Sequence, residues 1–450
     1  MFKQELSFKE KIMATVNIIG AGLAGVEAAW QAARAGAFVK LYEMKPTRFS
    51  PAHKSKGMAE LVCSNSLRSD SLENAVGILK AEMSELGSIV MESAFANRVP
   101  AGSCLAVDRE GFSEYITEKI CSNPNIEVIT GELEDFDTEA ITVVATGPLT
   151  DGKMAEFIKE LLGSEGLSFF DAAAPIVEKS TVDMDSAFIA SRWGKGEAAY
   201  INCPMTREEY DAFYKALITA ETAKLHDFDE DLKVFEGCMP VEVMASRGYE
   251  TLLFGPMKPV GLIDPKTGKE AFATVQLRQD NKDATMYNIV GFQTHLTFSE
   301  QKRVFGMIPA LKDANFLRYG VMHRNTFIDS PRHMTPFYSM RDKRNIYFAG
   351  QMTGVEGYLE SASSGMVAGI NAARSALGLS EIDFTSMSAI GALANYISNE
   401  SVVNFQPMNV NFGIIAPLDR KVKGGKKARN GAIGERCIEK IKEIKEEYGL

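Results

Sequence analysis

Two of the six cysteines stand in polar, turn-rich stretches of the sequence where a thiol could react. Cys238 lies between a glycine and a Met-Pro step in FEGCMPVE (235–242), with a glutamate on either side. Cys63 lies in LVCSNSLR (61–68), a segment rich in hydroxyl side chains. A buried cysteine usually packs as a small hydrophobe, whereas an ionised thiol is a nucleophile. Cys238 is therefore a candidate nucleophile, with an inert packed thiol as the alternative.

The cysteines do not have the spacing of a metal site. No two of them form a C-x-x-C pair and no histidine cluster accompanies them, so we expect no zinc site and no other metal. We expect structural roles for Cys104, Cys121 and Cys437, and lean to the same role for Cys203.

Length and composition are those of a globular protein. The chain has 450 residues, 45% of them hydrophobic, and a net charge of −10. This length predicts two or three domains. No apolar run approaches the roughly 18–20 residues of a membrane span, and the charged N-terminus does not resemble a secretory signal. We therefore expect a cytoplasmic protein with reduced cysteines and no membrane partner.

The acidic balance argues against broad coating of nucleic acid, but one segment is basic. Residues 419–430 read DRKVKGGKKARN. This segment is either a solvated surface loop or a flexible arm that contacts phosphates.

A glycine-rich turn near the start of the sequence has the pattern of a dinucleotide-binding fold. An apolar strand (16–19), the turn GAGLAG, an alanine-rich helix and a second strand form a β-turn-α-β unit. Gly20 permits the tight turn, Gly22 lets the backbone approach a pyrophosphate, and Gly25 allows close helix packing. Glu43 ends the second strand, where it can accept a hydrogen bond from a ribose hydroxyl. The predicted cofactor-binding residues of this unit are Gly20, Ala21, Gly22, Leu23, Ala24, Gly25 and Glu43.

Two later elements favour FAD over a nicotinamide as the bound cofactor. Residues 346–374 read as a strand, a glycine-rich turn and a long helix of small residues, which can place a helix N-terminus against a flavin. Residues 141–150, ITVVATGPLT, read as a strand that enters an Ala-Thr-Gly turn. The alternative is that the late glycines only pack helices. The predicted cofactor-binding residues here are Gly350, Gln351, Gly354, Glu356 and Gly357.

These elements predict an α/β protein: a Rossmann-like FAD-binding domain of the two-dinucleotide-domain flavoprotein type, with an inserted α/β domain. We expect the FAD-binding domain to comprise residues 14–190 and 331–450. Residues 191–330 differ in composition, with a mixed acidic helix and strands joined by Asp-Pro-Lys-Thr-Gly and Gln-Asp-Asn-Lys turns. They are the predicted insertion, which we expect to cover one face of the flavin.

Over nearly its whole length the chain resembles the folate- and FAD-dependent tRNA (uracil-5-)-methyltransferases, the TrmFO family once called Gid. The cysteine-bearing stretches are the most specific part of the resemblance, since GAGLAG fits many flavoproteins. Motifs that carry it are AELVCSNSLRSD (59–70), AVDREGF (106–112), FEGCMPVEVMASRG (235–248), VQLRQD (275–280), VGFQTHLTFSEQKRVF (290–305) and GQMTGVEGYLESASSG (350–365).

The resemblance implies that methylenetetrahydrofolate donates a one-carbon unit, that NADPH or NADH supplies electrons through FAD, and that the product is 5-methyluridine in the T-loop of tRNA. It implies that Cys238 adds to C6 of uracil. It pairs Cys63 with Cys238, as the base that takes the C5 proton or as an auxiliary thiol. It also places folate against His295 and Phe298, where relatives often have tryptophan in place of Phe298. Further polar candidates are Arg278, Gln279, His323, Arg324 and Asn325.

Four other functions remain open at this point. The same chemistry could act on a ribosomal RNA uridine, or the chain could be an NAD(P)H–flavin oxidoreductase of a small molecule. It could belong to a related, longer flavoprotein family that modifies wobble uridines, or be a non-catalytic RNA-binding flavoprotein.

Overall fold

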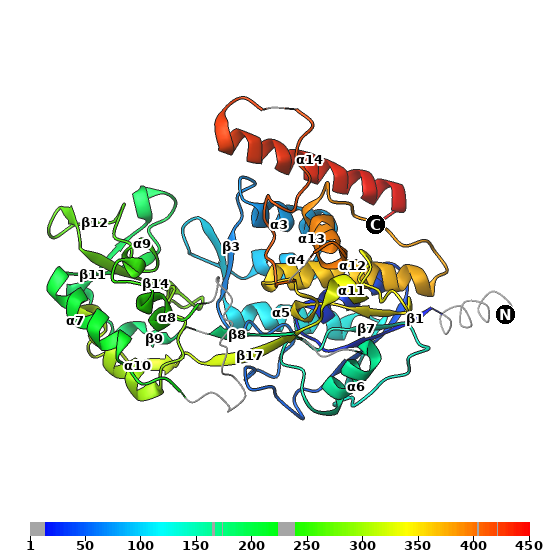
Figure 1. The fold of residues 1–450 in the computed structure, drawn as a ribbon, viewed down its shortest axis with the longest axis horizontal. Coiled ribbons are helices and arrows are strands. Elements are labelled where there is room, and N and C mark those ends of the chain that lie inside the picture. Colours follow the sequence, from blue (N-terminus) through cyan, green and yellow to red (C-terminus); the bar gives the residue numbers. More distant parts are fainter. Residues whose placement is uncertain (1–13, 164–166, 173, 224–238, 403–404, 421) are drawn as a thin grey trace.

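The computed structural model describes residues 14–163, 167–172, 174–223, 239–402, 405–420 and 422–450, with only the backbone described for 167–172 and 322–325 (Figure 1). Two units are visible. One is built on a parallel sheet and is called here the parallel-sheet unit. The other is built on an antiparallel sheet and is called the antiparallel-sheet unit. None of the helices in the described part of the chain is long and apolar enough to cross a membrane.

The parallel sheet has five strands in the order β18-β7-β1-β2-β6. Ile18 of β1 pairs with Leu41 of β2 and with Val143 of β7, and all three side chains are fully buried. Strands covered on both faces are expected to be apolar throughout. The strands are β1 (Thr15–Ile19), β2 (Phe38–Glu43), β6 (Ile126–Thr130), β7 (Thr142–Val144) and β18 (Ile346–Phe348).

Two helices that are distant in the sequence, α2 (Leu23–Arg34) and α12 (Tyr358–Ala376), pack closely together. A Cβ atom on Gly365 would lie 2.0 Å from the carbonyl oxygen of Ala24, and one on Gly369 would lie 2.4 Å from that of Ala28. Only glycine permits this approach of the two backbones. Gly365 and Gly369 are therefore packing residues. Their contacts join α2, from the early part of the chain, to α12, from the late part, within one unit.

Further helices surround this sheet, among them α14, which packs on α3 along the top of the view in Figure 1. Glu82 of α3 accepts hydrogen bonds from the amides of Ala389 and Ile390 and so fixes the start of α13. The helices are α3 (Ala75–Glu85), α4 (Ile89–Ala96), α5 (Arg109–Ser122), α6 (Gly152–Leu162), α11 (Ser330–His333), α13 (Ala389–Ser398) and α14 (Gly425–Tyr448). A small sheet has the order β3-β5-β4, with β3 (Ser66–Ser69), β4 (Arg98–Val99) and β5 (Cys104–Val107).

The antiparallel-sheet unit has six strands in the order β10-β11-β14-β15-β9-β16. Val275 and Leu277 of β14 enter a separate hydrophobic core, whereas the alternate residues Gln276 and Arg278 belong to the other face of the strand. The strands are β9 (Ile176–Glu178), β10 (Phe188–Ala190), β11 (Tyr200–Met205), β14 (Ala273–Gln279), β15 (Met286–Ile289) and β16 (Phe316–Arg318). The helices are α7 (Arg207–Ile218), α8 (Val241–Ser246), α9 (Thr251–Phe254) and α10 (Phe298–Phe305), and a hairpin is formed by β12 (Ile263–Asp264) and β13 (Lys269–Glu270).

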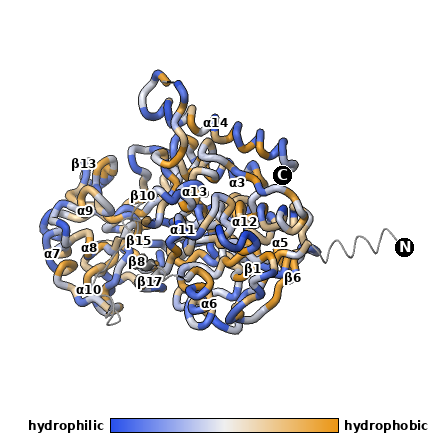
Figure 2. Tube along the Cα trace, turned by 45° about the vertical axis from the view of Figure 1, so that its right-hand side comes forward, coloured by the Kyte–Doolittle hydropathy of each residue, from blue (hydrophilic) through white to orange (hydrophobic). Residues whose placement is uncertain are grey.

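The two units are joined by a two-stranded ribbon of β8 (Leu167–Ala172) and β17 (Met322–Phe327), which runs between them in Figure 1. Because β9 and β10 belong to the six-stranded sheet, the strands of this sheet begin before the expected boundary at residue 191. We propose that the inserted domain begins at β9 and ends at β17. Figure 2 shows hydrophobic stretches concentrated inside both units and hydrophilic turns on the outer helices.

Candidate functional site

The first glycine turn joins β1 to the N-terminus of α2. Gly20 has φ +98°, and a Cβ there would lie 2.5 Å from the carbonyl oxygen of Ala145. A Cβ on Gly25 would lie 1.7 Å from the carbonyl oxygen of Gly20, so Gly25 is a packing residue. A Cβ on Gly22 would meet no atom within 4 Å. The backbone at Gly22 is thus open to a neighbouring group at the positive end of a helix.

Glu43 at the end of β2 holds this turn in place. Its Oε2 accepts a hydrogen bond of 2.6 Å from the amide of Ala21, and its Oε1 accepts one of 2.9 Å from the amide of Lys45. Each carboxylate oxygen has a second lone pair, and Glu43 lines a cavity beside the turn. It can therefore still accept a hydrogen bond from a ribose hydroxyl.

The second glycine turn follows β18 and leads into α12. Gly350 has φ +88°, and its amide donates to Ser364 Oγ at 2.7 Å. Gln351 Nε2 donates to Glu356 Oε1 at 2.8 Å. A Cβ on Gly354 would lie 2.4 Å from the ring of Phe405, and one on Gly357 would lie 2.4 Å from Glu360 Oε2. Gly354 and Gly357 therefore shape the turn.

A single cavity is lined by parts of both turns and by Cys63. Of the twelve residues predicted to bind the cofactor, those that line it are Gly20, Gly22, Leu23, Ala24, Glu43, Gly350 and Gln351. Those that do not are Ala21, Gly25, Gly354, Glu356 and Gly357. The Ala-Thr-Gly turn, with Thr146 and Gly147, also lines it. The open helix N-terminus and the acidic strand end suit a dinucleotide with a diphosphate and a ribose, so the residues present fit FAD.

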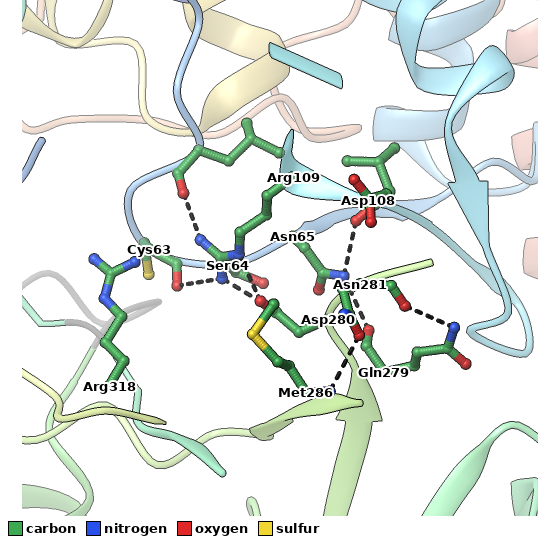
Figure 3. Close-up of polar contacts among 12 residues, drawn as sticks. Cys63, Ser64, Asn65, Asp108, Arg109, Gln279, Asp280, Asn281, Met286 and Arg318 are labelled. Carbon is green, nitrogen blue, oxygen red and sulfur yellow. Dashed lines mark hydrogen bonds and ion pairs between the residues drawn. The ribbon is translucent and has the colours of Figure 1, made fainter. Parts of the chain in front are cut away.

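The loop that carries Cys63 is held through its backbone (Figure 3). The hydroxyl of Tyr358, at the start of α12, accepts hydrogen bonds from the amides of Cys63 at 2.7 Å and Ser64 at 3.0 Å. Arg318 donates to the carbonyl of Val62 from the antiparallel-sheet unit, and its guanidinium points toward Cys63. Arginine beside a cysteine is a surrounding that favours the thiolate.

A buried ion pair fixes the same loop from the other side. Arg109 Nε and Nη2 donate to Asp280 at 2.8 and 3.1 Å, and Nη2 also donates to the carbonyl of Cys63 at 3.2 Å. Arg109 further bonds the carbonyl of Leu61. Burial lowers the pKa of Arg109, but the charge and hydrogen bonds of Asp280 outweigh it, so the pKa lies above its usual value. The pair joins the two units directly beneath Cys63.

The remaining polar residues of the loop also serve as links between the units. Asn65 is fully buried, and its Nδ2 donates to the carbonyls of Val107 and Gln279. Arg278 Nη2 donates to Ser64 Oγ at 2.7 Å. Arg278 and Gln279, which were candidates for ligand binding, therefore belong to the junction of the two units in this structure.

Cys238 and the residues from 224 to 238 lie outside the described part of the chain, and so do the side chains of His323, Arg324 and Asn325. The segment that follows Cys238 is described. The amide of Val241 donates to the carbonyl of Gln293 at 2.7 Å. Glu242 accepts from Thr294 Oγ1 at 2.9 Å and from the amide of His295 at 2.7 Å. These bonds anchor α8 to the segment between β15 and α10 that carries His295.

His295 and Phe298 do not line the cavity of the two glycine turns. Burial lowers the pKa of His295, which favours the neutral ring. The ring of Phe298 is 55% exposed and stacks on Tyr319 at 4.8 Å, and Tyr319 stacks in turn on Phe316 at 5.5 Å. One face of Phe298 is thus held by a ladder of aromatic rings.

Cys203 and Cys437 are buried, unlike Cys63. Burial raises the pKa of Cys203 in β11 and of Cys437 in α14 to about 12, so both remain thiols. No group of three or more potential metal ligands comes together among the described residues. The basic segment is partly helical, since α14 begins at Gly425, and Lys427 pairs with Glu73 at 2.9 Å.

The residues that hold the Cys63 loop had no assigned role in the sequence. Tyr358, Arg109, Asp280 and Arg318 lie far from Cys63 in the chain. No local pattern marks them, although Arg109, Asp280 and Tyr358 fall in the quoted motifs AVDREGF, VQLRQD and GQMTGVEGYLESASSG. The position of Arg109 directly after a strand, in the first turn of a helix, was the one available signal.

The fold and the paired glycine turns define a dinucleotide-binding protein of the flavoprotein type. A family model described as glucose inhibited division protein A matches residues 15–380. The structure of Aquifex aeolicus GidA aligns with a TM-score of 0.69 at 18% identity, covering 97% of this chain and 75% of that one, which shows a common fold. The expected α/β fold is thereby confirmed.

Sequence relatives define the family more closely. A methylenetetrahydrofolate–tRNA-(uracil-5-)-methyltransferase TrmFO of Ligilactobacillus salivarius is 57% identical over 432 residues, 96% of this chain and 98% of that protein. A protein of the same name from Acetivibrio thermocellus is 58% identical over 433 residues, 96% of this chain and 99% of that protein. The chain belongs to the TrmFO family.

Proposed function

We propose that this protein transfers a one-carbon unit from methylenetetrahydrofolate to C5 of a uracil in tRNA and reduces it to a methyl group, with FAD as cofactor. The observation that carries the proposal is that Cys63 shares one cavity with both glycine turns, in a chain 57% identical to a relative of that activity. NADPH or NADH supplies the electrons.

The protein's own residues bind and orient the flavin. The N-terminus of α2 receives the diphosphate at Gly22, Glu43 accepts from a ribose hydroxyl, and the turn at Gly350 faces the same cavity. FAD, when bound there, carries the one-carbon unit and supplies a hydride. Tyr358, Arg109 and Arg318 keep the Cys63 loop against this cavity.

The cysteines activate the uracil. C5 of uracil is a weak nucleophile, and addition of a thiolate to C6 converts the ring to an enolate that can attack an electrophilic carbon. We assign this addition to Cys238. Once C5 has formed the new carbon bond, its proton must leave before the thiolate can be expelled. We assign removal of that proton to Cys63, with its guanidinium neighbours stabilising the ionised sulfur.

His295 and Phe298 are proposed as the folate contacts. The exposed face of Phe298 offers a stacking surface for the pterin, and the aromatic ladder of Tyr319 and Phe316 keeps that ring fixed. The anchoring of His295 by Glu242 ties the folate contact to the helix that follows Cys238.

The RNA substrate is proposed to be the T-loop of tRNA, whose target uridine must leave its stack to reach the thiols. The basic start of α14 is a candidate phosphate contact. We propose that the reaction takes place in the cytoplasm, where tRNA, folate and reduced thiols meet.

The test is transfer of label. The purified protein is incubated with unmodified tRNA transcript, NADPH and methylenetetrahydrofolate labelled in its one-carbon unit, beside Cys238→Ala, Cys63→Ala and a ribosomal RNA transcript. Label in 5-methyluridine of tRNA that is lost in both variants is the expected result. Label in ribosomal RNA alone would show that the substrate is ribosomal RNA and not tRNA. NADPH oxidation without label in either RNA would exclude methyl transfer and indicate a flavin oxidoreductase.

A further inference from the structure

An exposed tryptophan stands on a turn whose backbone is held in an unfavourable conformation. Trp193 is 62% exposed and has φ 61° and ψ 18°, the left-handed region that a bulky residue seldom adopts. Among the described residues, neither those that line the cavity nor those of the hydrophobic cores include Trp193. Strained residues of this kind often mark sites where a ligand or partner is held.

The turn is fixed firmly from below. The amide of Trp193 donates to the carbonyl of Gly261 at 2.8 Å. Arg192 donates to the carbonyls of Val260 and Lys258 and, at 3.1 Å, to Gln276 Oε1. A Cβ on Gly261 would lie 2.6 Å from the indole, so one face of the ring rests on bare backbone. The indole is thereby a rigid platform.

The turn that carries Trp193 follows β10 and contacts β14, the strand that leads to the Cys63 loop. Gln276, which bonds Arg192, is followed on the same side of β14 by Arg278, which bonds Ser64. Two residues of a strand span about 7 Å. Just after the turn, a Cβ on Gly196 would lie 3.2 Å from Gly102 of the parallel-sheet unit. The turn of Trp193 therefore contacts both units and is linked through Gln276 and Arg278 to the Cys63 loop.

The charge around the platform favours a polyanion. The turn from 192 to 197 carries Arg192 and Lys195 against Glu197, and Lys258 lies beside it. Glu270, which accepts from the amide of Gly261 at 2.7 Å, is the second acidic neighbour, so the basic side chains outnumber the acidic ones in a chain with a net charge of −10. Single-stranded nucleic acid is bound by aromatic side chains on which bases stack, flanked by cations that follow the phosphates. Ile189 and Ile263 add exposed apolar surface nearby.

We propose that Trp193 stacks on an unpaired base of the RNA substrate next to the uridine that is flipped into the site. The inference rests on the proposed function and names a contact for its substrate. It assigns Trp193 a role in RNA binding and none in folate binding or flavin chemistry.

Fluorescence tests the contact directly. The chain has two tryptophans, and the other, Trp30, is half-buried and donates to the carbonyl of Gly87. In the flavin-loaded Trp30→Phe protein, emission from Trp193 is followed as a T-arm hairpin transcript is added. We expect saturable quenching. As a check that keeps Trp30, the emission of Trp193→Phe is subtracted from that of the parent protein, and the remaining emission, which comes from Trp193, should show the same quenching. No change in either emission would overturn the inference.

Kinetics provides the second test. In the label-transfer assay, Trp193→Ala is expected to raise KM for the RNA roughly 5- to 150-fold, the loss of one stacked base, with KM for methylenetetrahydrofolate unchanged. Trp193→Phe should recover most of the loss. Phe254→Ala, which removes another exposed aromatic ring, is the matched control and should behave as the parent. Equal KM for RNA in the parent and Trp193→Ala would refute the contact, while absence of label in the parent would refute the proposed function instead.

Discussion

Asp280→Asn is the perturbation that most sharply tests how the Cys63 loop is held. The change keeps the shape of the side chain and removes its charge. Arg109 is then left as a cation 15% exposed, with Leu61 and Cys63 carbonyls as partners but no counter-charge. The side chain of Asp280 is 1% exposed, so water cannot replace it.

The magnitude follows from this burial. Removing one partner of a buried ion pair costs about 3–5 kcal/mol of unfolding free energy, because a buried charge is left uncompensated. The exposed pair Arg98–Asp70, at 3.3 Å and with side chains 46% and 36% exposed, is the matched control. Exposed pairs contribute about 0–1 kcal/mol, so Asp70→Asn should change the free energy of unfolding very little.

Urea-induced unfolding, followed by circular dichroism and by release of the flavin, measures both changes. Arg109→Met with Asp280→Asn in one chain should be at least about 1 kcal/mol more stable than the sum of the two single changes predicts, since no charge is left unpaired. Methyl transfer should stay impaired in that double variant, because the bonds from Arg109 to the Cys63 loop are gone. Equal effects of Asp280→Asn and Asp70→Asn would refute the reasoning.

Three further predictions address the pH dependence, the packing and the folate contact. Burial raises the pKa of Glu82 to about 8 from an ordinary value of 4.5. Between these pH values the folded state keeps a proton that the unfolded chain releases. The contribution of protonated Glu82 to the free energy of unfolding is therefore lost as the pH rises from 4.5 to about 8. The stability advantage of the parent over Glu82→Gln should therefore shrink across that window, by at most about 1.4 kcal/mol per pH unit, in urea denaturation at several pH values; a constant difference would contradict it. Gly365→Ala should lower the thermal midpoint sharply because its Cβ would lie 2.0 Å from a backbone oxygen of α2, whereas Gly431→Ala in α14, whose Cβ would meet nothing within 4 Å, should be neutral or stabilising by up to about 1 kcal/mol. Phe298→Trp should lower KM for methylenetetrahydrofolate by enlarging the stacking face, and an unchanged KM would remove Phe298 from the folate site.

The parts of the fold that the sequence predicted are those with a local cause. A strand, three glycines at fixed spacing and an acidic strand end are close together in the chain, and each has its own steric or hydrogen-bonding reason. The β1-turn-α2-β2 unit and the placement of Glu43 beside the turn are therefore readable from the sequence. The late glycines had two roles, since Gly350 lines the cavity while Gly365 packs against α2.

What the sequence did not predict depends on contacts between distant residues. Arg109 meets Asp280 across the two units, and Tyr358 meets Cys63 across the parallel-sheet unit. Nothing near either residue in the chain indicates its partner. The expected domain boundary at 191 was placed at a change in composition. The six-stranded sheet also contains β9 and β10, which lie before residue 191 and join the sheet by strand pairing. The segment 419–430 was expected to be a surface loop or a flexible arm, yet α14 begins within it, at Gly425.

The most direct test of the central claim follows the atoms of the new methyl group. The protein is incubated with unmodified tRNA, unlabelled NADPH and methylenetetrahydrofolate carrying two deuterium atoms on its one-carbon unit, and the nucleosides are analysed by mass spectrometry. We expect 5-methyluridine that retains both deuterium atoms, with tetrahydrofolate as the folate product, because the third hydrogen arrives as a hydride by way of the flavin. Unlabelled 5-methyluridine, or dihydrofolate formed in equal amount, would contradict it.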